Sequence, residues 1–211
     1  MMSAIRYFSE NPADALPAPQ TGTTPAVPEQ LAAFFAHHSR VAVAFSGGVD
    51  SAYLLYAAKA CGCKVKGYYA KSVFQPRFEL DDATRLAKEL GVELAVLPLE
   101  VLDNPDIQQN RADRCYYCKQ AIFTRLLTAA AADGFSVLAD GTNASDDAND
   151  RPGMRALAEL KVVSPLRLCG ITKAQLRECS RLAGLFTWNK PAYACLATRV
   201  ATGCALDGET L

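Results

Sequence analysis

The feature of this sequence that most restricts its fold is an apolar run followed at once by a glycine pair and a helix-forming stretch. Val41–Phe45 is the apolar run, Ser46–Ser51 reads Ser-Gly-Gly-Val-Asp-Ser, and residues 51–60 favour a helix. A buried strand that ends in such a turn directs backbone N–H groups and the positive end of a helix dipole at one spot. The sequence therefore predicts a phosphate site at residues 46–51.

Each residue type in this hexapeptide suits an anion site. Gly47 and Gly48 let the backbone approach a phosphate closely, and the hydroxyls of Ser46 and Ser51 are further donors. Asp50 can hold a magnesium ion that offsets the phosphate charge. The alternative is an ordinary strand-to-helix turn, and the pattern is not a Walker A loop because no Gly-Lys-Ser/Thr follows at the required spacing.

Composition and charge narrow the class of partner. The 211 residues are 50% apolar, and 22 basic residues balance 22 acidic ones. No polybasic surface for nucleic acid or an anionic membrane is indicated, so a small-molecule substrate is favoured. Residues 1–10 lack the apolar core of a secretory signal, and no apolar stretch reaches the length of a membrane span. We expect a cytoplasmic protein whose eight cysteines are free, metal-binding or catalytic thiols.

The order of apolar patterns predicts an α/β fold. Strands are expected at 41–45, 65–70, 93–97 and 136–139, alternating with helices at 51–60, 79–90, 115–132, 154–161 and 172–183. Such alternation implies a parallel sheet with helices on both faces, Rossmann-like, with the ligand at the carboxyl ends of the strands. We therefore expect the adenine of a nucleotide near Ala70 and Gly141.

The chain is expected to have three parts. Residues 1–27 are predicted to be a disordered leader, because proline is frequent there and apolar residues are too few to offset chain ordering. Residues 28–190 form the nucleotide-binding domain. Residues 191–211 comprise a proline-bounded active-site loop and the start of a C-terminal region.

Three cysteines are candidates for chemistry. Cys115 and Cys118 lie at the start of a predicted helix, where positions i and i+3 share a face and can hold one metal centre. A single CxxC is half a site, and it can also be two small buried residues. Cys195, in the loop that begins at Lys190, is the third candidate.

Several segments together resemble one family. These are the loop at Ser46, RCYYCK from Arg114, DGTNASDD from Asp140, DRPG from Asp150, SPL from Ser164 and KPAYACLATR from Lys190. Their order is similar to that of the LarE family of ATP-dependent sulfur transferases, within the PP-loop ATPases (adenine nucleotide alpha hydrolase fold). The resemblance implies cleavage of ATP between the α and β phosphates, adenylation of a carboxylate of a pyridinium biscarboxylate mononucleotide, and replacement of oxygen by sulfur. That chemistry makes the nickel-pincer cofactor of lactate racemase.

The resemblance implies one of two sulfur sources. One branch of the family sacrifices a cysteine that aligns with Ala194, leaving dehydroalanine. The other branch holds a 4Fe–4S cluster with three cysteines that match Cys115, Cys118 and Cys195, which leaves one iron open for an extra sulfide. We predict the cluster, with sacrifice of Cys195 as the alternative.

Three further residues are candidate ligands. Asp146 is predicted to hold magnesium and Asp147 to orient the substrate, although acidic residues are also common in solvated turns. Arg199 is predicted to pair with the substrate phosphate, with a surface ion pair as its alternative.

Other functions share part of this pattern. A PP-loop tRNA thiolase also pairs such a loop with cysteines, but the zero net charge argues against RNA. An amidotransferase-type synthetase needs no thiols, and a nucleotide-binding module that has lost catalysis would not need an intact loop. LarE proteins continue with a C-terminal region beyond the position of Leu211, so we expect a truncated chain, with the homo-oligomer implied by the resemblance in doubt.

Overall fold

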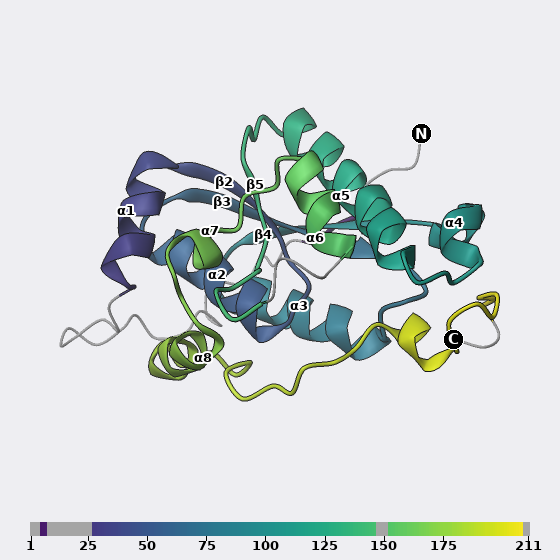
Figure 1. Ribbon diagram of the computed structural model, residues 1–211. Helices are drawn as coiled ribbons and strands as arrows, with labels where there is room; N and C mark the ends of the chain where they lie inside the picture. The colour runs from purple at the N-terminus through teal and green to yellow at the C-terminus, as the bar shows by residue number, and fades with distance from the viewer. Residues whose placement is uncertain (1–4, 8–26, 147–151, 209–211) are drawn as a thin grey trace.

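The computed structural model of the protein describes residues 5–7, 27–146 and 152–208 (Figure 1). The strands are β1 (Ile5–Tyr7), β2 (Arg40–Ala44), β3 (Lys64–Lys71), β4 (Glu93–Pro98) and β5 (Leu138–Ala139). The α-helices are α1 (Glu29–His37), α2 (Val49–Ala60), α3 (Arg77–Glu89), α4 (Pro105–Gln108), α5 (Arg114–Ala132), α6 (Pro152–Glu159), α7 (Pro165–Leu168) and α8 (Lys173–Leu182). Short 3₁₀-helices lie at Val101–Asp103 and Leu196–Arg199.

The strands form one sheet in the order β1-β4-β3-β2-β5. β4, β3, β2 and β5 are parallel, with Val43 of β2 opposite Gly67 of β3 and Ala139 of β5. Each parallel pair needs a crossover, and helices supply it, which is the arrangement predicted from the alternating patterns. The predicted α/β fold is confirmed.

Two apolar layers cover the two faces of the sheet. Val41 and Val43 pack on the side of α1, α2, α3, α7 and α8, whereas Ala42 packs on the side of α5 and α6 (Figure 1). The same alternation sends Tyr69 of β3 to the first layer and Tyr68 to the second. Because both faces of the sheet are buried, the middle residues of β2 and β4 are all apolar. The polar residues of the site therefore lie at and beyond the ends of the strands.

β1 is an antiparallel strand at the edge of the sheet, paired with β4 from Ile5 opposite Val96 to Tyr7 opposite Leu94. It lies within residues 1–27, which the sequence predicts to be a disordered leader, and residues 8–26 are outside the described part of the chain. A strand of three residues is too short to show a periodic pattern, so its backbone pairing with β4 could not be read from the sequence.

Residues 191–208 pack against the α/β core through a third, smaller apolar cluster. Ala197 and Leu206 are buried there with Phe74, Val101 and Ile107. Backbone hydrogen bonds support the contact, with the N–H of Leu196 donating to Phe74 O (3.0 Å) and that of Leu206 to Gln108 O (2.8 Å). The segment that carries Cys195 is therefore seated on the core.

Element boundaries differ from the predicted ones by a few residues. α2 begins at Val49 rather than Ser51, so Asp50 and Ser51 lie in its first turn, and β5 is shorter than predicted. Among the described residues, no helix combines the length and apolar character needed to cross a bilayer.

Candidate nucleotide and cysteine site

The turn between β2 and α2, residues Ser46–Ser51, is called the phosphate loop below. Gly47 has φ +75°, and a Cβ added to it would lie 2.8 Å from the carbonyl oxygen of Glu79 in α3. A side chain there would be strained and would also collide with backbone. The loop therefore lies directly against α3, and this conformation requires glycine.

The first turn of α2 is arranged as an anion site. Gly48 is the N-cap, and since it has no side chain it cannot satisfy the first N–H groups of the helix. Ser46 N–H donates to Ser51 Oγ (3.2 Å), and the two serine hydroxyls are 3.1 Å apart. The free N–H groups and the helix dipole favour a bound phosphate, as the sequence predicts.

The turn after β5 lies against this first turn. A Cβ added to Gly141 would be 2.8 Å from Ser51 N and 3.1 Å from the Cβ of Asp50. Glycine at this position lets the carboxyl ends of β2 and β5 meet at one place. Gly141, predicted to lie near the adenine, is thus in contact with the phosphate loop.

Asp50 already has two partners. Lys173 Nζ donates to Asp50 Oδ2 at 2.5 Å, and Asn143 Nδ2 donates to Asp50 Oδ1 at 3.3 Å. Both side chains are only partly exposed, at 33% for Lys173 and 27% for Asp50. Asp50 therefore points into the site, and its carboxylate is held in place by α8 and by the turn after β5.

The predicted magnesium and substrate ligands near Asp50 are only partly described. Asp146 lines the same cavity, and its carboxylate accepts from Asn143 N–H at 3.0 Å. Asp147 lies outside the described residues. Over residues 5–7, 27–146 and 152–208, no group of three His, Cys, Asp or Glu side chains is arranged to hold a metal ion.

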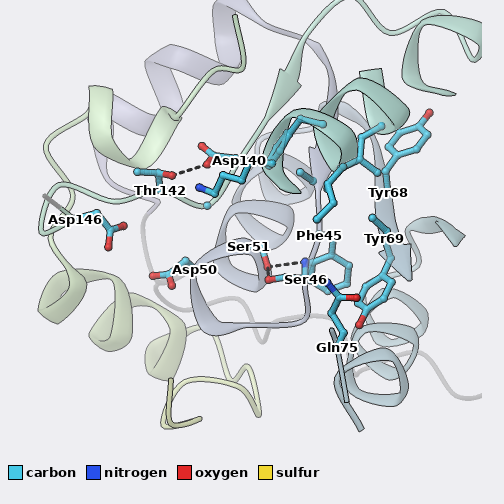
Figure 2. A pocket seen from close by; sticks show the side chains of 17 residues that line it. Phe45, Ser46, Asp50, Ser51, Tyr68, Tyr69, Gln75, Asp140, Thr142 and Asp146 are labelled. Carbon is cyan, nitrogen blue, oxygen red and sulfur yellow. Dashed lines mark hydrogen bonds between the residues drawn. The ribbon is translucent and has the colours of Figure 1, made fainter. Parts of the chain in front are cut away.

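A cavity of about 340 Å³ opens beside the phosphate loop (Figure 2). Figure 2 shows Asp50 and Asp146 on one side of it and Tyr68 and Tyr69 on the other. The residues that line it come from the ends of β2, β3 and β5 and from one face of α5, and they include Ala44, Phe45, Ser46, Asp50, Ser51, Tyr68, Tyr69, Ala70, Gln75, Lys119, Ile122, Phe123, Leu126, Asp140, Gly141, Thr142 and Asp146. Ala70 and Gly141 both line the cavity.

Two polar groups of the cavity wall are buried. Asp140 is 5% exposed and accepts hydrogen bonds from the hydroxyls of Thr142 and Ser164. Tyr69 is 1% exposed, and its hydroxyl has no hydrogen-bond partner among the described residues. Burial raises the pKa of Tyr69, so its hydroxyl is a neutral donor. A buried donor without a partner in a cavity wall fits a site that takes a polar ligand.

The three candidate cysteines are brought to one region. Cys115 and Cys118 are in the first turn of α5, and Cys195 immediately precedes the 3₁₀-helix Leu196–Arg199. Arg114, buried beside them, donates to Ala197 O (3.0 Å) and to Asn110 Oδ1. Asn110 Nδ2 in turn donates to the carbonyl oxygens of Val200 and Ala201. Arg114 and Asn110 thus fix the Cys195 segment to the start of α5.

The electrostatics agree with the proximity of the three thiols. Burial raises the pKa of Cys118 to about 12, with Cys195 and Cys115 adding to the effect. Desolvation also raises the pKa of Cys195, which Ala197 and Arg114 lower and Cys115 raises further. A cation bound near Cys118 and Cys195 would favour their thiolate forms.

Arg199 lies apart from the cavity lining. It is on the 3₁₀-helix Leu196–Arg199, where it donates to the hydroxyl of Tyr193, with its guanidinium 5.6 Å from the Tyr193 ring centre. Its role toward a substrate phosphate stays a prediction.

Some residues at the site were not singled out from the sequence. Lys173 gave no signal, because a lysine at a helix start is common in any α/β protein. Asn143 and Asp140 were quoted only as part of the segment DGTNASDD, without a role of their own. Lys190 was seen only as the first residue of its segment, although its ammonium contacts the phosphate loop. These residues are recognised only from the structure, in which each contacts a residue that is far away in the sequence.

The comparison with protein families supports this geometry. Residues 39–179, which include the phosphate loop, α5 and α8, match the family model described as the tRNA methyl transferase HUP domain. The chain belongs to this HUP-domain family. The match covers the parallel sheet and every residue named around Asp50, and it agrees with the predicted PP-loop fold.

Three relatives extend the match beyond this domain. An uncharacterized protein of Synechocystis is 34% identical over 87% of the chain and 69% of its own length. The pyridinium-3,5-bisthiocarboxylic acid mononucleotide synthase of Lactiplantibacillus plantarum is 33% identical over 82% of the chain and 63% of its own length. An uncharacterized protein of Methanocaldococcus jannaschii is 28% identical over 77% and 61%. The chain spans about two thirds of the length of these relatives, and the match to the synthase confirms the resemblance to LarE-type proteins.

Proposed function

We propose that this protein is an ATP-dependent sulfur transferase that converts a carboxylate of a pyridinium biscarboxylate mononucleotide into a thiocarboxylate, in synthesis of the nickel-pincer cofactor of lactate racemase. The observation that carries the proposal is that one helix, α5, presents two thiols in its first turn and lines the nucleotide cavity with Ile122 and Phe123. The named activity of the synthase relative supports it. A phosphate site and a sulfur site on the same sheet edge suit adenylation followed by sulfur transfer.

In the first step the phosphate loop would hold the leaving group. The pyrophosphate of ATP accepts hydrogen bonds from the first N–H groups of α2, with the adenine near Ala70 and Gly141. A carboxylate oxygen of the substrate attacks the α-phosphorus, and pyrophosphate leaves. Lys173 now donates a hydrogen bond to Asp50. Once the Lys173 side chain turns to donate to a phosphate oxygen instead, Asp50 would hold magnesium against the phosphates.

We propose that Cys115, Cys118 and Cys195 would hold a 4Fe–4S cluster, because α5 and the Cys195 segment are fastened together beside them. A mononuclear site would need sulfurs about 4 Å apart, and the described chain has no such group of three. The sulfur atoms of three cysteines that bind one cluster lie on the order of 6–7 Å apart. The thiols of Cys118, Cys115 and Cys195 interact electrostatically, which is compatible with such a spacing. When bound through Cys115, Cys118 and Cys195, such a cluster supplies an open iron that can carry the sulfide to be transferred. The hydrogen bonds of Arg114 and Asn110 to the backbone of the 197–201 stretch would keep Cys195 near the other two thiols.

A second sulfur source remains open within the same function. Cys195 can be the donor itself: its thiolate attacks the acyl-adenylate and releases AMP, and removal of the Cα proton then breaks the Cβ–S bond, which leaves the thiocarboxylate and dehydroalanine. Exposure of Cys195 at the surface of the 191–208 segment is compatible with this route. Asp146 is proposed as a ligand of magnesium. Asp147 and Arg199 are proposed as ligands of the substrate.

The test is turnover of the reduced full chain under anaerobic conditions with Mg-ATP and the pyridinium biscarboxylate mononucleotide, before and after reconstitution with iron and sulfide. We expect pyrophosphate and a thiocarboxylate product, with the larger yield after reconstitution. Two parallel reactions should give no product: one with tRNA in place of the mononucleotide, and one with ammonia in place of the sulfur source. Thiolated tRNA, or amide formation from ammonia, would overturn the proposal.

Intact mass decides the sulfur source. The protein mass should be unchanged after turnover if the cysteines are ligands, whereas loss of hydrogen sulfide from Cys195 lowers it by roughly 34 Da. A stoichiometric loss at Cys195 would replace the cluster route by the sacrificial one.

A further inference from the structure

Lys190 lies in the chain that follows α8, just before the segment that carries Cys195, and its side chain reaches the phosphate loop. Its Nζ donates to the carbonyl oxygen of Gly47 at 3.2 Å and to Asp82 Oδ2 of α3 at 2.6 Å. The side chain is only 14% exposed, and Nζ lies 5.4 Å from the ring centre of Phe78. A partly buried ammonium therefore faces the loop where pyrophosphate would bind.

The backbone around Lys190 is anchored independently of this contact. Arg177 of α8 donates to Trp188 O at 2.8 Å and to Lys190 O at 2.9 Å. The next anchor is the hydrogen bond from Leu196 N–H to Phe74 O. Residues 191–195 between these anchors are exposed and have no regular structure, so the position of Cys195 depends on the two ends and on the packing of Tyr193 against Phe78.

Aromatic contacts link Lys190 to the segment that carries Cys195. The Lys190 ammonium lies over the Phe78 ring of α3, and that ring packs edge-to-face on Tyr193, with the ring centres 5.1 Å apart. Tyr193 is two residues before Cys195 in the chain. A shift of the Lys190 ammonium therefore alters a contact that helps to position this segment.

The ammonium has capacity for one more bond. It carries three N–H donors, of which the structure accounts for two. A phosphate on the loop would compete with Asp82 for this cation, because the pair is partly buried and weakly screened. We propose that Lys190 is a positioning residue that binds a phosphate group held by the phosphate loop and thereby sets the position of Cys195 according to whether a nucleotide is bound.

This inference rests on the proposed function, in that it takes the phosphate loop to be the pyrophosphate site. The experiment uses the full chain with reduced, metal-free thiols, and the probes are inorganic pyrophosphate and α,β-methylene-ATP with magnesium. Binding is measured by calorimetry, and alkylation of Cys195 is followed by peptide mass spectrometry, with Cys204 as an exposed internal reference. Ligand should change the alkylation rate of Cys195 at least threefold in the wild type and in the conservative variant Lys190→Arg.

Lys190→Met should lose that response while still binding the ligand. The matched control is Arg85→Met, which removes a cation of α3 that pairs with Glu89 away from the loop. A merely structural ion pair would alter Cys195 equally with and without ligand. A response in Lys190→Met equal to that of the wild type, or a wild type that binds without response, overturns the inference.

Asp82→Asn gives a prediction of the opposite sign. The variant weakens the bond between Asp82 and Lys190, so Lys190 should be free to bind phosphate, and the affinity for pyrophosphate should rise two- to fivefold. If the Asp82–Lys190 pair were only structural, its loss would lower that affinity. A weaker affinity in Asp82→Asn overturns the inference even if Lys190→Met fails to fold. Failure of the wild type to bind either probe would instead remove the nucleotide site of the proposed function, and this inference with it.

Discussion

The phosphate loop and the Cys195 segment are built in opposite ways. The loop is six consecutive residues between β2 and α2, and its form follows from a glycine at φ +75° and a helix that starts at once. The Cys195 segment has a single 3₁₀ turn and is held by Asn110, Arg114 and a small apolar cluster. A local motif thus defines the nucleotide half, whereas contacts between residues more than 80 positions apart define the sulfur half.

The largest expected effect concerns the sulfur half and is the protection of Cys118. A folded-state pKa of about 12, against roughly 8.5 in an unfolded chain, lowers the thiolate fraction at pH 8 by about 2000-fold. Alkylation of Cys118 in the metal-free folded protein should be at least 100-fold slower than in urea and should rise up to pH 12. Because the folded-state pKa is raised, the stability that the neutral thiol contributes is present below about pH 8.5 and is lost as the pH rises through about 12. Equal rates in the folded and unfolded chains would contradict the burial of this thiol.

Asp50→Asn tests the nucleotide half alone. It removes the negative charge that would hold magnesium, and pyrophosphate formation should fall about 100-fold or more. The position of the Cys195 segment should not change, as checked by its alkylation rate. Glu89→Gln, which affects an exposed pair on α3, is the control and should keep the wild-type rate. Unchanged pyrophosphate release by Asp50→Asn with magnesium present would remove Asp50 from the assignment.

Asn110→Gly tests the sulfur half alone. Asn110 has φ +50°, which glycine adopts without strain, so the variant loses mainly the hydrogen bonds to Val200, Ala201 and Arg114. Loss of about 1–3 kcal/mol of local anchoring should make proteolysis after residue 190 roughly 10-fold faster, with ATP affinity unchanged. Asn110→Asp keeps the acceptor for Arg114 and should show a smaller effect. If ATP affinity fell as much as protease resistance, the two halves would not be separable.

Tyr69→Phe should have the smallest effect, and again on the nucleotide half. The hydroxyl that is removed has no partner among the described residues, so the free energy of unfolding should stay the same or rise. If the hydroxyl donates to the bound nucleotide, ATP affinity should fall about two- to tenfold, in line with one hydrogen bond. Calorimetry and thermal unfolding of the same samples separate these results, and a loss of stability without a loss of affinity would contradict a ligand role.

The difference between the halves also explains what the sequence could predict. The parallel sheet and the phosphate loop were predictable because runs such as Val41–Phe45 and the hexapeptide after it express their structure locally. The cation on Asp50 was not, since Lys173 is 123 positions away from it in the chain. Arg114 was quoted as the first residue of RCYYCK, but its anchoring role gave no signal, because that role depends on the carbonyl of Ala197, which any residue at that position would present.

The placement of both sites along α5 has a consequence for how the reaction distance is set. Cys118 lies next to Lys119 and one helical turn, about 6 Å along the helix axis, from Ile122, and both Lys119 and Ile122 line the cavity. The distance between the proposed sulfur site and the cavity is therefore set by the backbone of α5 and does not depend on the length of any loop. Inserting or deleting a single residue between the two would rotate one site by about 100° relative to the other. The spacing within this stretch of α5 therefore fixes how the two sites face each other, whatever contacts the substrate makes elsewhere.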